Sequence, residues 1–341
     1  MSEKLEAQPP VGGVGRGGVL GHDETDAVLR AALRDAAGGG ADAHLAAWTV
    51  DSHFARYGKR RVVRYDLEAR VAGVPRHYRW VGKFYDRDED AQRVATVLRQ
   101  LAAIGSAARD AGPLVPWVLA YHAPRRFLLL TYESGESVGD AIAHDAAAVL
   151  DALGRALAAL HAAAVTLDGL THPGDVLEDL RPKIDDLCAR FPGEAAALRR
   201  SFRQLEGGPA QPPPAAPAFV HGDFGPANLL WRDRRIVALD FDKCTRGDPA
   251  MDLGNLLTQL RRIAVRKPHK LRDFDGARRR LLDAYRRSSP PDAGLEERVV
   301  WYERTTLLRK IHRLIFNTTR HPGPEAARER QVEAARLVGL R

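Results

Sequence analysis

A segment in the second half of the chain places an acid, an amide and another acid at spacings that suit one type of chemistry. It begins with His221-Gly-Asp223, Asn228 follows five residues after Asp223, and Asp240 follows twelve residues later at the end of the apolar run 236–239. This spacing suits phosphoryl transfer from Mg-ATP, in which one carboxylate orients a hydroxyl group while an amide and a second carboxylate bind the metal ion. Asp223 is therefore the candidate base, and Asn228 and Asp240 are the candidate metal ligands.

Length and composition are those of a globular enzyme. The chain has 341 residues, of which 45% are hydrophobic and 28% are charged, so it is long enough for a large core and for two lobes. The formal net charge is +8, but the arginines are spread along most of the sequence. Without paired zinc-binding cysteines or an aromatic and basic strand of the RNA-binding type, we predict no nucleic-acid partner.

Cysteine content and hydropathy further limit the class of protein that this sequence can encode. Cys188 and Cys244 are the two cysteines and lie far apart, so neither a disulfide framework nor a cysteine-ligated zinc site is expected. The longest apolar runs fall well short of the ~20 residues of a membrane span, and the N-terminus lacks the apolar core of a signal peptide. We expect a cytoplasmic enzyme with no membrane partner, and we find no sequence signal for an oligomeric state.

The first third of the chain is predicted to form a small lobe of mostly antiparallel sheet with helices. Residues 1–22 are rich in glycine and proline and are expected to be a mobile tail, and residues 23–132 are expected to form the N-lobe. Alternating apolar residues and helical periodicity predict the elements. They are a helix at 26–36, strands at 61–71 and 77–85, a helix at 88–103, and strands at 117–121 and 126–132.

Beyond residue 133 the spacing of apolar residues becomes helical. Residues 133–341 are expected to form a larger C-lobe with the catalytic loop and the substrate pocket. Helical patterns occupy 146–164, 177–205 and most of the chain after Met251, and a proline-rich connector at 207–217 leads to the segment with the candidate site. Short strands should flank the loop of that segment. The predicted fold class is α+β, with a small α/β lobe, a larger helical lobe and the chemistry at their junction.

Several segments together resemble the aminoglycoside phosphotransferase family, which has the bilobal fold of protein kinases. The resemblance rests on His221-Gly-Asp223 with Asn228, on Leu239-Asp-Phe-Asp242 and on Gly247-Asp-Pro-Ala-Met-Asp-Leu-Gly254. It extends upstream to Leu157-Ala-Ala-Leu-His161 and to Lys83 in a predicted strand, and it spans roughly residues 48–320.

The resemblance implies a role for each matching position. Asp223 would accept or orient the proton of the attacking hydroxyl, and Asn228 and Asp240 would hold Mg²⁺ against the nucleotide phosphates. Lys83 would contact the α- and β-phosphates. The backbone of Thr131 and Glu133 would meet the adenine, and Asp252 would hold the catalytic loop in place as a buried carboxylate.

The function implied is that of an ATP-dependent O-phosphotransferase, with GTP as a possible alternative donor. The phosphate acceptor would be a small hydroxylated molecule such as a sugar, an aminocyclitol, an antibiotic or a related metabolite.

Two features depart from the family pattern. The usual acidic partner of the strand lysine has no clear equivalent, since the helix after Lys83 offers Glu89 and Asp90 early and Gln92 later. The expected phosphate-covering loop, residues 52–59, contains a single glycine, so Lys59 or Arg60 would have to assist the backbone in binding phosphate. These departures keep open a second interpretation, a catalytically weak, kinase-like nucleotide-binding module.

Other classes of enzyme share part of the pattern. Asp240-Phe-Asp242 could be the metal-binding pair of a glycosyltransferase or the nucleophile pair of an aspartyl phosphatase, but neither accounts for Asp223, Asn228 and Lys83. Asp242 itself could be an additional metal ligand or a polar turn residue. His221 is interpreted as an organiser of the loop and His161 as a packing residue with its hydrogen bonds satisfied.

The stretch 261–287 is densely basic. If it contributed to the substrate pocket, as helices in this position do in the family, a neutral or anionic hydroxyl compound would suit the pocket better than a polycationic aminoglycoside. The alternative is that this stretch is a solvated helix face.

Overall fold

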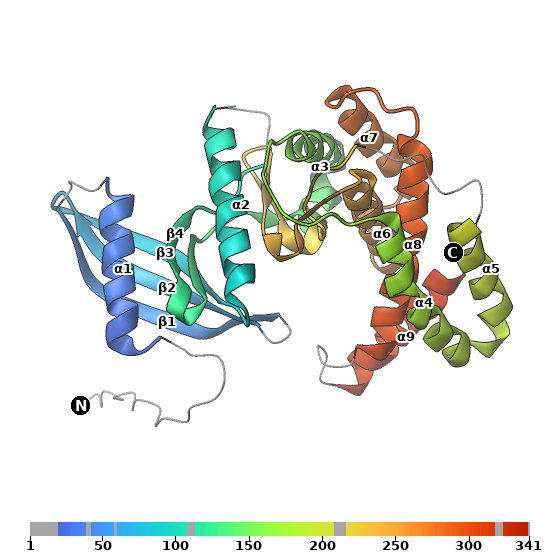
Figure 1. Cartoon of the computed structure of the whole chain (residues 1–341), viewed down its shortest axis with the longest axis horizontal. Helices are drawn as coiled ribbons and strands as arrows, with labels where there is room; N and C mark the ends of the chain where they lie inside the picture. The colour runs from blue at the N-terminus through green and yellow to red at the C-terminus, as the bar shows by residue number, and fades with distance from the viewer. Residues whose placement is uncertain are drawn as a thin grey trace. The chain divides into compact units, whose positions relative to one another are not determined.

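The computed structural model describes residues 20–38, 42–57, 60–107, 113–207, 216–317 and 323–339 (Figure 1). The chain divides into two compact units, one comprising Met1–Gln92 with Val118–Tyr132 and the other comprising Arg93–Trp117 with Glu133–Arg341. The predicted N-terminal tail, 1–22, lies outside the described residues except for its last three. Of these, Leu20 is buried in the core of the first unit and His22 begins the first helix.

The first unit is built on a five-stranded antiparallel sheet with the strand order β1-β2-β3-β5-β4. Its elements in chain order are α1 (His22–Ala36), β1 (Ala43–Tyr57), β2 (Arg60–Val71), β3 (Val74–Phe84), β4 (Val118–His122) and β5 (Phe127–Thr131). The helix α2 (Asp88–Ala107) follows β3, and the division between the units falls within it. The strands and helices predicted for this part of the chain are all present, with ends that differ by a few residues.

Alternation along β2 explains how the sheet acquires a core. Val63, Tyr65 and Leu67 are separated by two residues each, so their side chains share one face of the sheet, and all three are buried. They cluster with Leu29 and Leu33 of α1, which lies across the sheet in Figure 1. The period-two pattern of β2 and the helical spacing of α1 therefore bring their apolar side chains into one buried layer.

The second unit is mainly helical. Its helices are α3 (Val138–His161), α4 (Pro173–Arg190), α5 (Ala195–Gly207), α6 (Ala250–Arg266), α7 (Phe274–Arg287), α8 (Leu295–Phe316) and α9 (Pro324–Val338). In its described helices, and in those of the first unit, no stretch has both the length and the apolar composition needed to cross a membrane. The predicted α+β class is confirmed.

Two small antiparallel sheets in the second unit frame the segment with the candidate site. One has the order β6-β8-β9 and the other pairs β7 with β10. The strands are β6 (Glu136–Ser137), β7 (Ala218–Val220), β8 (Leu229–Arg232), β9 (Arg235–Ala238) and β10 (Thr245–Gly247). Residues 221–228 link β7 to β8, and residues 239–244 link β9 to β10. Paired strands therefore hold both ends of each segment.

The helix α3 begins earlier than the pattern 146–164 suggests. Its first turn is capped by the Ser137 side chain, which accepts a hydrogen bond from the Asp140 amide. The backbone then leaves the helical conformation at Asp145 (φ −139°, ψ 51°) before the helix resumes. The break shifts the apolar positions to a new helical register. The sequence pattern therefore predicted only the longer part of the helix, which follows Asp145.

The helices α6 and α8 approach each other closely at Gly254. A methyl group added there would lie 2.6 Å from Tyr302 Cβ and 2.7 Å from the Tyr302 carbonyl carbon. Since the α8 backbone can yield only by moving the helix, we expect Gly254→Ala to lower the free energy of unfolding by about 1–3 kcal/mol. Urea denaturation monitored by circular dichroism measures this loss.

The matched control is Gly174→Ala in α4, where an added Cβ meets nothing within 4 Å. Removing a helical glycine from open space should leave the stability unchanged or raise it by up to about 1 kcal/mol. Equal effects of the two substitutions would contradict close packing of α6 on α8 at Gly254.

Candidate active site

The loop between β7 and β8 is organised by the buried side chain of His221. Its Nε2 atom donates a hydrogen bond to the Leu239 carbonyl at 3.0 Å, and its Nδ1 atom accepts one from the Asp223 amide at 3.3 Å. One ring nitrogen donates and the other accepts, which is the pattern of a neutral imidazole. The interpretation of His221 as a loop organiser is confirmed.

Gly222 gives this loop its sharp turn. Its φ is +76°, and a Cβ at this position would lie 2.2 Å from the Lys243 carbonyl oxygen. Both the positive φ and the closeness of a second backbone segment therefore require glycine between His221 and Asp223.

Asp252, near the start of α6, holds the same loop from the inside of the unit. Its carboxylate is fully buried and accepts hydrogen bonds from the amides of His221 at 2.7 Å and Gly222 at 2.9 Å. His161 Nε2 lies 3.3 Å from the same carboxylate, and His161 Nδ1 lies 3.0 Å from the Tyr285 hydroxyl. The loop-holding role implied for Asp252 is confirmed, and so is the packing role of His161.

The hairpin of β8 and β9 places Asn228 and Asp240 at one end. Leu229 pairs with Ala238, and the Leu239 amide continues the ladder with a 2.9 Å hydrogen bond to the Asn228 carbonyl. Asn228 precedes β8 and Asp240 follows β9, so both lie at the open end of the hairpin. Asp240 adopts the left-handed conformation (φ 64°, ψ 65°), which aspartate tolerates better than most residues.

A direct contact joins Asn228 to the loop of Asp223. The Asn228 amide nitrogen donates a hydrogen bond to the Asp223 carbonyl at 3.0 Å. The amide oxygen is therefore the Asn228 atom left to bind a metal ion. An amide oxygen and one carboxylate form a suitable protein contribution to a Mg²⁺ site, because Mg²⁺ keeps waters and substrate phosphates as its other ligands. Among the described residues no group of three or more His, Cys, Asp or Glu side chains is placed to hold a metal ion.

The Asp223 carboxylate lies next to a lysine that follows the second motif. Lys243 Nζ is 2.8 Å from Asp223 Oδ2. Burial raises the pKa of Asp223, but the charges of Lys243 and Lys310 outweigh this effect, and the pKa of Asp223 lies below its usual value. Asp223 is consequently ionised at neutral pH and able to accept a hydrogen bond from a hydroxyl group.

An arginine of α2 anchors the segment that follows Asp240. Arg93 donates hydrogen bonds to the carbonyls of Asp242 at 3.0 Å and Cys244 at 2.9 Å. Arg93 lies about 150 residues before these partners, and nothing in the sequence around it indicates the contact. Asp242 itself lies in the short 3₁₀ helix Phe241–Lys243, and both interpretations of its side chain remain predictions.

A cavity of about 150 Å³ opens beside Asp223 within the second unit. Val176 of α4, Met251 and Asn255 of α6, and one face of α8 line it together with the Asp223 loop and Lys243. The α8 face is formed by Tyr302, Thr305, Thr306, Arg309, Lys310 and Arg313. Sequence reasoning missed this face, although the spacing of three and four residues among its polar members was a readable signal.

The candidate nucleotide residues Lys83 and Thr131 lie on adjacent central strands of the first unit. Lys83 of β3 pairs with Leu128 of β5, and Trp80 of β3 pairs with Thr131. Glu133 follows β5 and belongs to the second unit, where its largely buried carboxylate forms a 2.9 Å ion pair with Arg232. Since that side chain is engaged, only the backbone of Glu133 is left for the implied contact with adenine, which remains a prediction.

The residues at the two departures from the family pattern lie at the start of α2 and in β1. Asp90, a candidate acidic partner of Lys83, forms a 3.0 Å ion pair with Arg87, the residue before α2. The expectation of a loop at 52–59 is wrong for residues 52–57, whose backbone continues strand β1. Lys59 lies outside the described residues.

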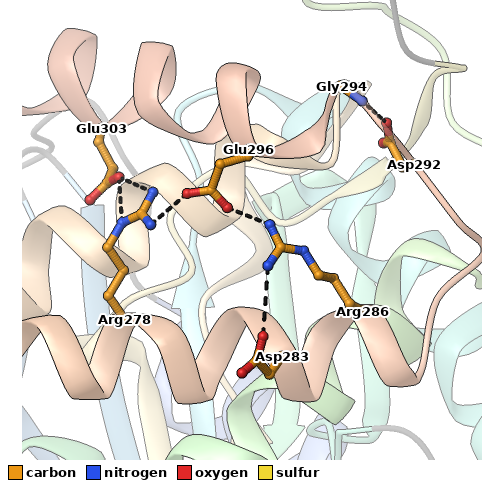
Figure 2. Close-up of polar contacts among 7 residues, drawn as sticks. All are labelled: Arg278, Asp283, Arg286, Asp292, Gly294, Glu296 and Glu303. Carbon is orange, nitrogen blue, oxygen red and sulfur yellow. Dashed lines mark hydrogen bonds and ion pairs between the residues drawn. The ribbon is translucent and has the colours of Figure 1, made fainter.

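The basic stretch 261–287 contributes no residue to the lining of the cavity beside Asp223. Figure 2 shows instead that Arg278 and Arg286 of α7 bridge to acids of α7 and α8. Arg278 contacts Glu296 at 2.6 Å and Glu303 at 3.1 Å, and Arg286 contacts Glu296 and Asp283. The charges of these two arginines therefore join helices instead of facing the cavity.

Comparisons with known proteins agree with this geometry. The model of the phosphotransferase enzyme family (APH) matches residues 60–295, well over half of the chain. No curated protein matches the chain. Solved structures with a similar fold include macrolide 2′-phosphotransferase MphH from Brachybacterium faecium, at 23% identity and a TM-score of 0.52, with 89% of this chain and 97% of that chain covered.

Two further similar structures contain bound nucleotide and antibiotic. A thermostable mutant of aminoglycoside phosphotransferase APH(4)-Ia, in ternary complex with ADP and hygromycin B, has 16% identity and a TM-score of 0.56, with 86% of this chain and 94% of that chain covered. The GDP and kanamycin complex of APH(2″)-IIIa has 13% identity and a TM-score of 0.57, with coverage of 90% and 97%. At these identities the likeness establishes the fold, which is that of kinase-like phosphotransferases. Together with the family match, the architecture and the organised loop of Asp223 show that the chain belongs to the phosphotransferase enzyme family and is a small-molecule phosphotransferase.

Proposed function

We propose that this protein is an ATP-dependent O-phosphotransferase acting on a small hydroxylated molecule of the sugar, aminocyclitol, antibiotic or related metabolite class. The observation that carries the proposal is the arrangement around Asp223. Buried His221 and Asp252 hold its loop, Asn228 is hydrogen-bonded to it, and a cavity opens beside its carboxylate. In this proposal residues 23–132 bind the nucleotide, and residues 133–341 supply the catalytic loop and the acceptor pocket.

The transfer proceeds by in-line displacement. The acceptor hydroxyl oxygen forms a bond to the γ-phosphorus, the bond from that phosphorus to the β–γ bridging oxygen breaks, and ADP leaves with the electron pair. Asp223 orients the hydroxyl group and receives its proton, which then passes to solvent. Because the transition state is loose, positioning and charge neutralisation matter more than basicity, and an Asp223 with a lowered pKa is adequate.

The other candidate residues position the nucleotide. The Asn228 amide oxygen and the Asp240 carboxylate would hold Mg²⁺, which neutralises the phosphate oxygens. Lys83 would bind the α- and β-phosphates, and the backbone of Thr131 and Glu133 would bind the adenine. Either ATP or GTP is a suitable donor in this scheme, and the similar structures carry ADP in one case and GDP in another.

The test is nucleotide consumption by the purified protein with a panel of alcohols, sugars and aminocyclitols, using ATP and GTP in turn. We expect acceptor-dependent release of ADP or GDP, loss of this activity on chelation of divalent cations, and recovery on addition of Mg²⁺. Nucleotide binding without turnover of any acceptor would overturn the proposal in favour of a kinase-like binding module.

A further inference from the structure

The cavity beside Asp223 has a strongly unequal charge. Among the described residues that line it, Asp223 is the single carboxylate, while Lys243, Arg309, Lys310 and Arg313 are cationic. Three of these cations lie on one face of α8 at spacings of one, three and four residues. A polycationic molecule would meet repulsion from four cations in this cavity and attraction from one acid that is already paired.

The four cationic side chains of this cavity differ in their ion-pair partners. Lys243 is paired with Asp223 at 2.8 Å, and Arg309 is paired with Asp179 of α4 at 2.8 Å. Within the part of the chain that the structure describes, the Lys310 amine makes no hydrogen bond or ion pair. Lys310 is therefore the cation of this cavity that most needs a partner.

The electrostatics of Lys310 indicate the sign of that partner. Burial, against an opposing effect of Asp223 and with added contributions from the charges of Arg313, Arg262 and Lys243, lowers the pKa of Lys310 to about 8. Lys310 is half-buried, and withdrawing an ammonium group from water without a hydrogen-bonded counter-charge is costly. An anion beside Lys310 would remove this cost and favour the charged form.

We propose that the phosphate acceptor carries an anionic group, a carboxylate or a phosphate, in addition to its hydroxyl, and that Lys310 binds this group. The inference rests on the proposed function and names the acceptor class of the same site. Arg313 lies one turn further along the same face of α8 and extends the anion-binding surface. A cavity of about 150 Å³ is half the lower limit of ~300 Å³ for pockets of drug-sized ligands, so it suits a short hydroxy acid or a single phosphorylated ring.

Matched acceptors test the charge of the substrate. One set comprises glycerol, glycerate and glycerol phosphate, and another comprises glucose, gluconate, glucose 6-phosphate and glucosamine. We expect kcat/KM to be at least about tenfold higher for the anionic members than for the neutral and cationic ones. The ratio of the carboxylate to the phosphate members identifies the anion, and preference for either supports the inference. A preference for glycerol, glucose or glucosamine overturns it.

A substitution at Lys310 tests the residue assigned to the anion. In Lys310→Met the advantage of anionic over neutral acceptors should fall by about 10- to 100-fold, mainly through KM, because a charge-assisted hydrogen bond is lost. The control is Lys267→Met, which removes the same charge from an exposed lysine outside the cavity and should leave the advantage intact. Lys310→Met should unfold at the same or a higher urea concentration, since it removes a half-buried charge. Equal effects of the two substitutions overturn the role of Lys310.

Binding without turnover separates this inference from the proposed function. Glycerate, glycerol phosphate and glycerol are titrated calorimetrically into the nucleotide-free protein, into Lys310→Met and into Lys267→Met. Tighter binding of the two anions that is lost only in Lys310→Met supports the anionic site, even if no acceptor is phosphorylated. Turnover of acceptors irrespective of their charge, with equal binding by all three proteins, preserves the phosphotransferase and overturns the anionic site.

The pH dependence of glycerate binding gives an additional prediction. The carboxylate of glycerate stays ionised from about pH 7 to about pH 9.5, whereas Lys310 loses its proton as the pH rises past a pKa of about 8. The groups that face Lys310 are Asp223, Lys243, Arg262, Arg309 and Arg313. We expect affinity to fall with rising pH, by up to about tenfold per pH unit above the pKa, and we expect this fall to be absent in Lys310→Met. An unchanged pH profile in Lys310→Met would assign the titration to another of these groups.

Discussion

Replacing Asp223 by asparagine should lower kcat about 10²- to 10⁴-fold while the protein stays folded. The amide has nearly the same shape as the carboxylate, but it cannot receive the proton of the acceptor hydroxyl and it loses the charge that attracts Lys243. Since Asp223 is ionised at neutral pH, the loss should be seen across the neutral range. Initial rates of ADP release at saturating acceptor measure kcat, and a denaturation curve checks that folding is intact.

The control for this substitution is Asp233→Asn in the exposed turn between β8 and β9. Asp233 has a φ of 50°, which asparagine tolerates as well as aspartate, so this exchange should leave kcat within about twofold. Retention of more than about a tenth of kcat in Asp223→Asn would show that another group receives the proton.

Replacing Asp252 by alanine should lower the free energy of unfolding by about 2–5 kcal/mol. The fully buried carboxylate accepts hydrogen bonds from two backbone amides, and each amide left without a partner costs about 1–3 kcal/mol. His161, 3.3 Å from the same carboxylate, would also lose a partner. The midpoint and slope of urea denaturation measure the loss, which should appear as a lower midpoint with a similar slope.

The same substitution should disturb catalysis through the loop, because Asp252 holds the two residues that precede Asp223. Asp168→Ala, at an exposed loop position, is the control and should change stability by less than about 0.5 kcal/mol. If Asp252→Ala were as stable as Asp168→Ala, the buried hydrogen bonds to the loop would not support the site as described.

Some features of this protein could be predicted from local patterns. The extended run 61–71 indicated a strand, and the structure has that strand, with Val63, Tyr65 and Leu67 buried on one face. The spacing of Asp223 and Asn228 fits within a single loop, so the chain between them is too short to separate the two residues widely, and they are joined by a hydrogen bond. His221, two residues from Asp223, could be interpreted as a loop organiser for the same reason.

The ends of helices were less predictable where two apolar patterns overlap in the sequence. The start of α3 was missed because a helix that breaks at Asp145 has two apolar registers, and the longer one dominates the pattern. The role of the basic stretch 261–287 was also not predictable from the sequence. A run of arginines is compatible with a pocket, a solvated face or bridges between helices. Figure 2 shows bridges for Arg278 and Arg286, whose acidic partners on α8 lie up to 25 residues away in the sequence.

The amino-acid sequence by itself therefore determined the fold class, the family and the candidate loop of Asp223, because the motifs depend on spacings of a few residues. The tertiary structure decided which distant side chains surround Asp223. Lys243 reaches Asp223 from the turn after Asp240, and Lys310 reaches it because α8 packs on α6 and α4. The helix α2 places Arg93 against the segment after Asp240. Contacts of this kind depend on how helices pack rather than on residue spacing, so the charge of the cavity beside Asp223 becomes visible only in three dimensions.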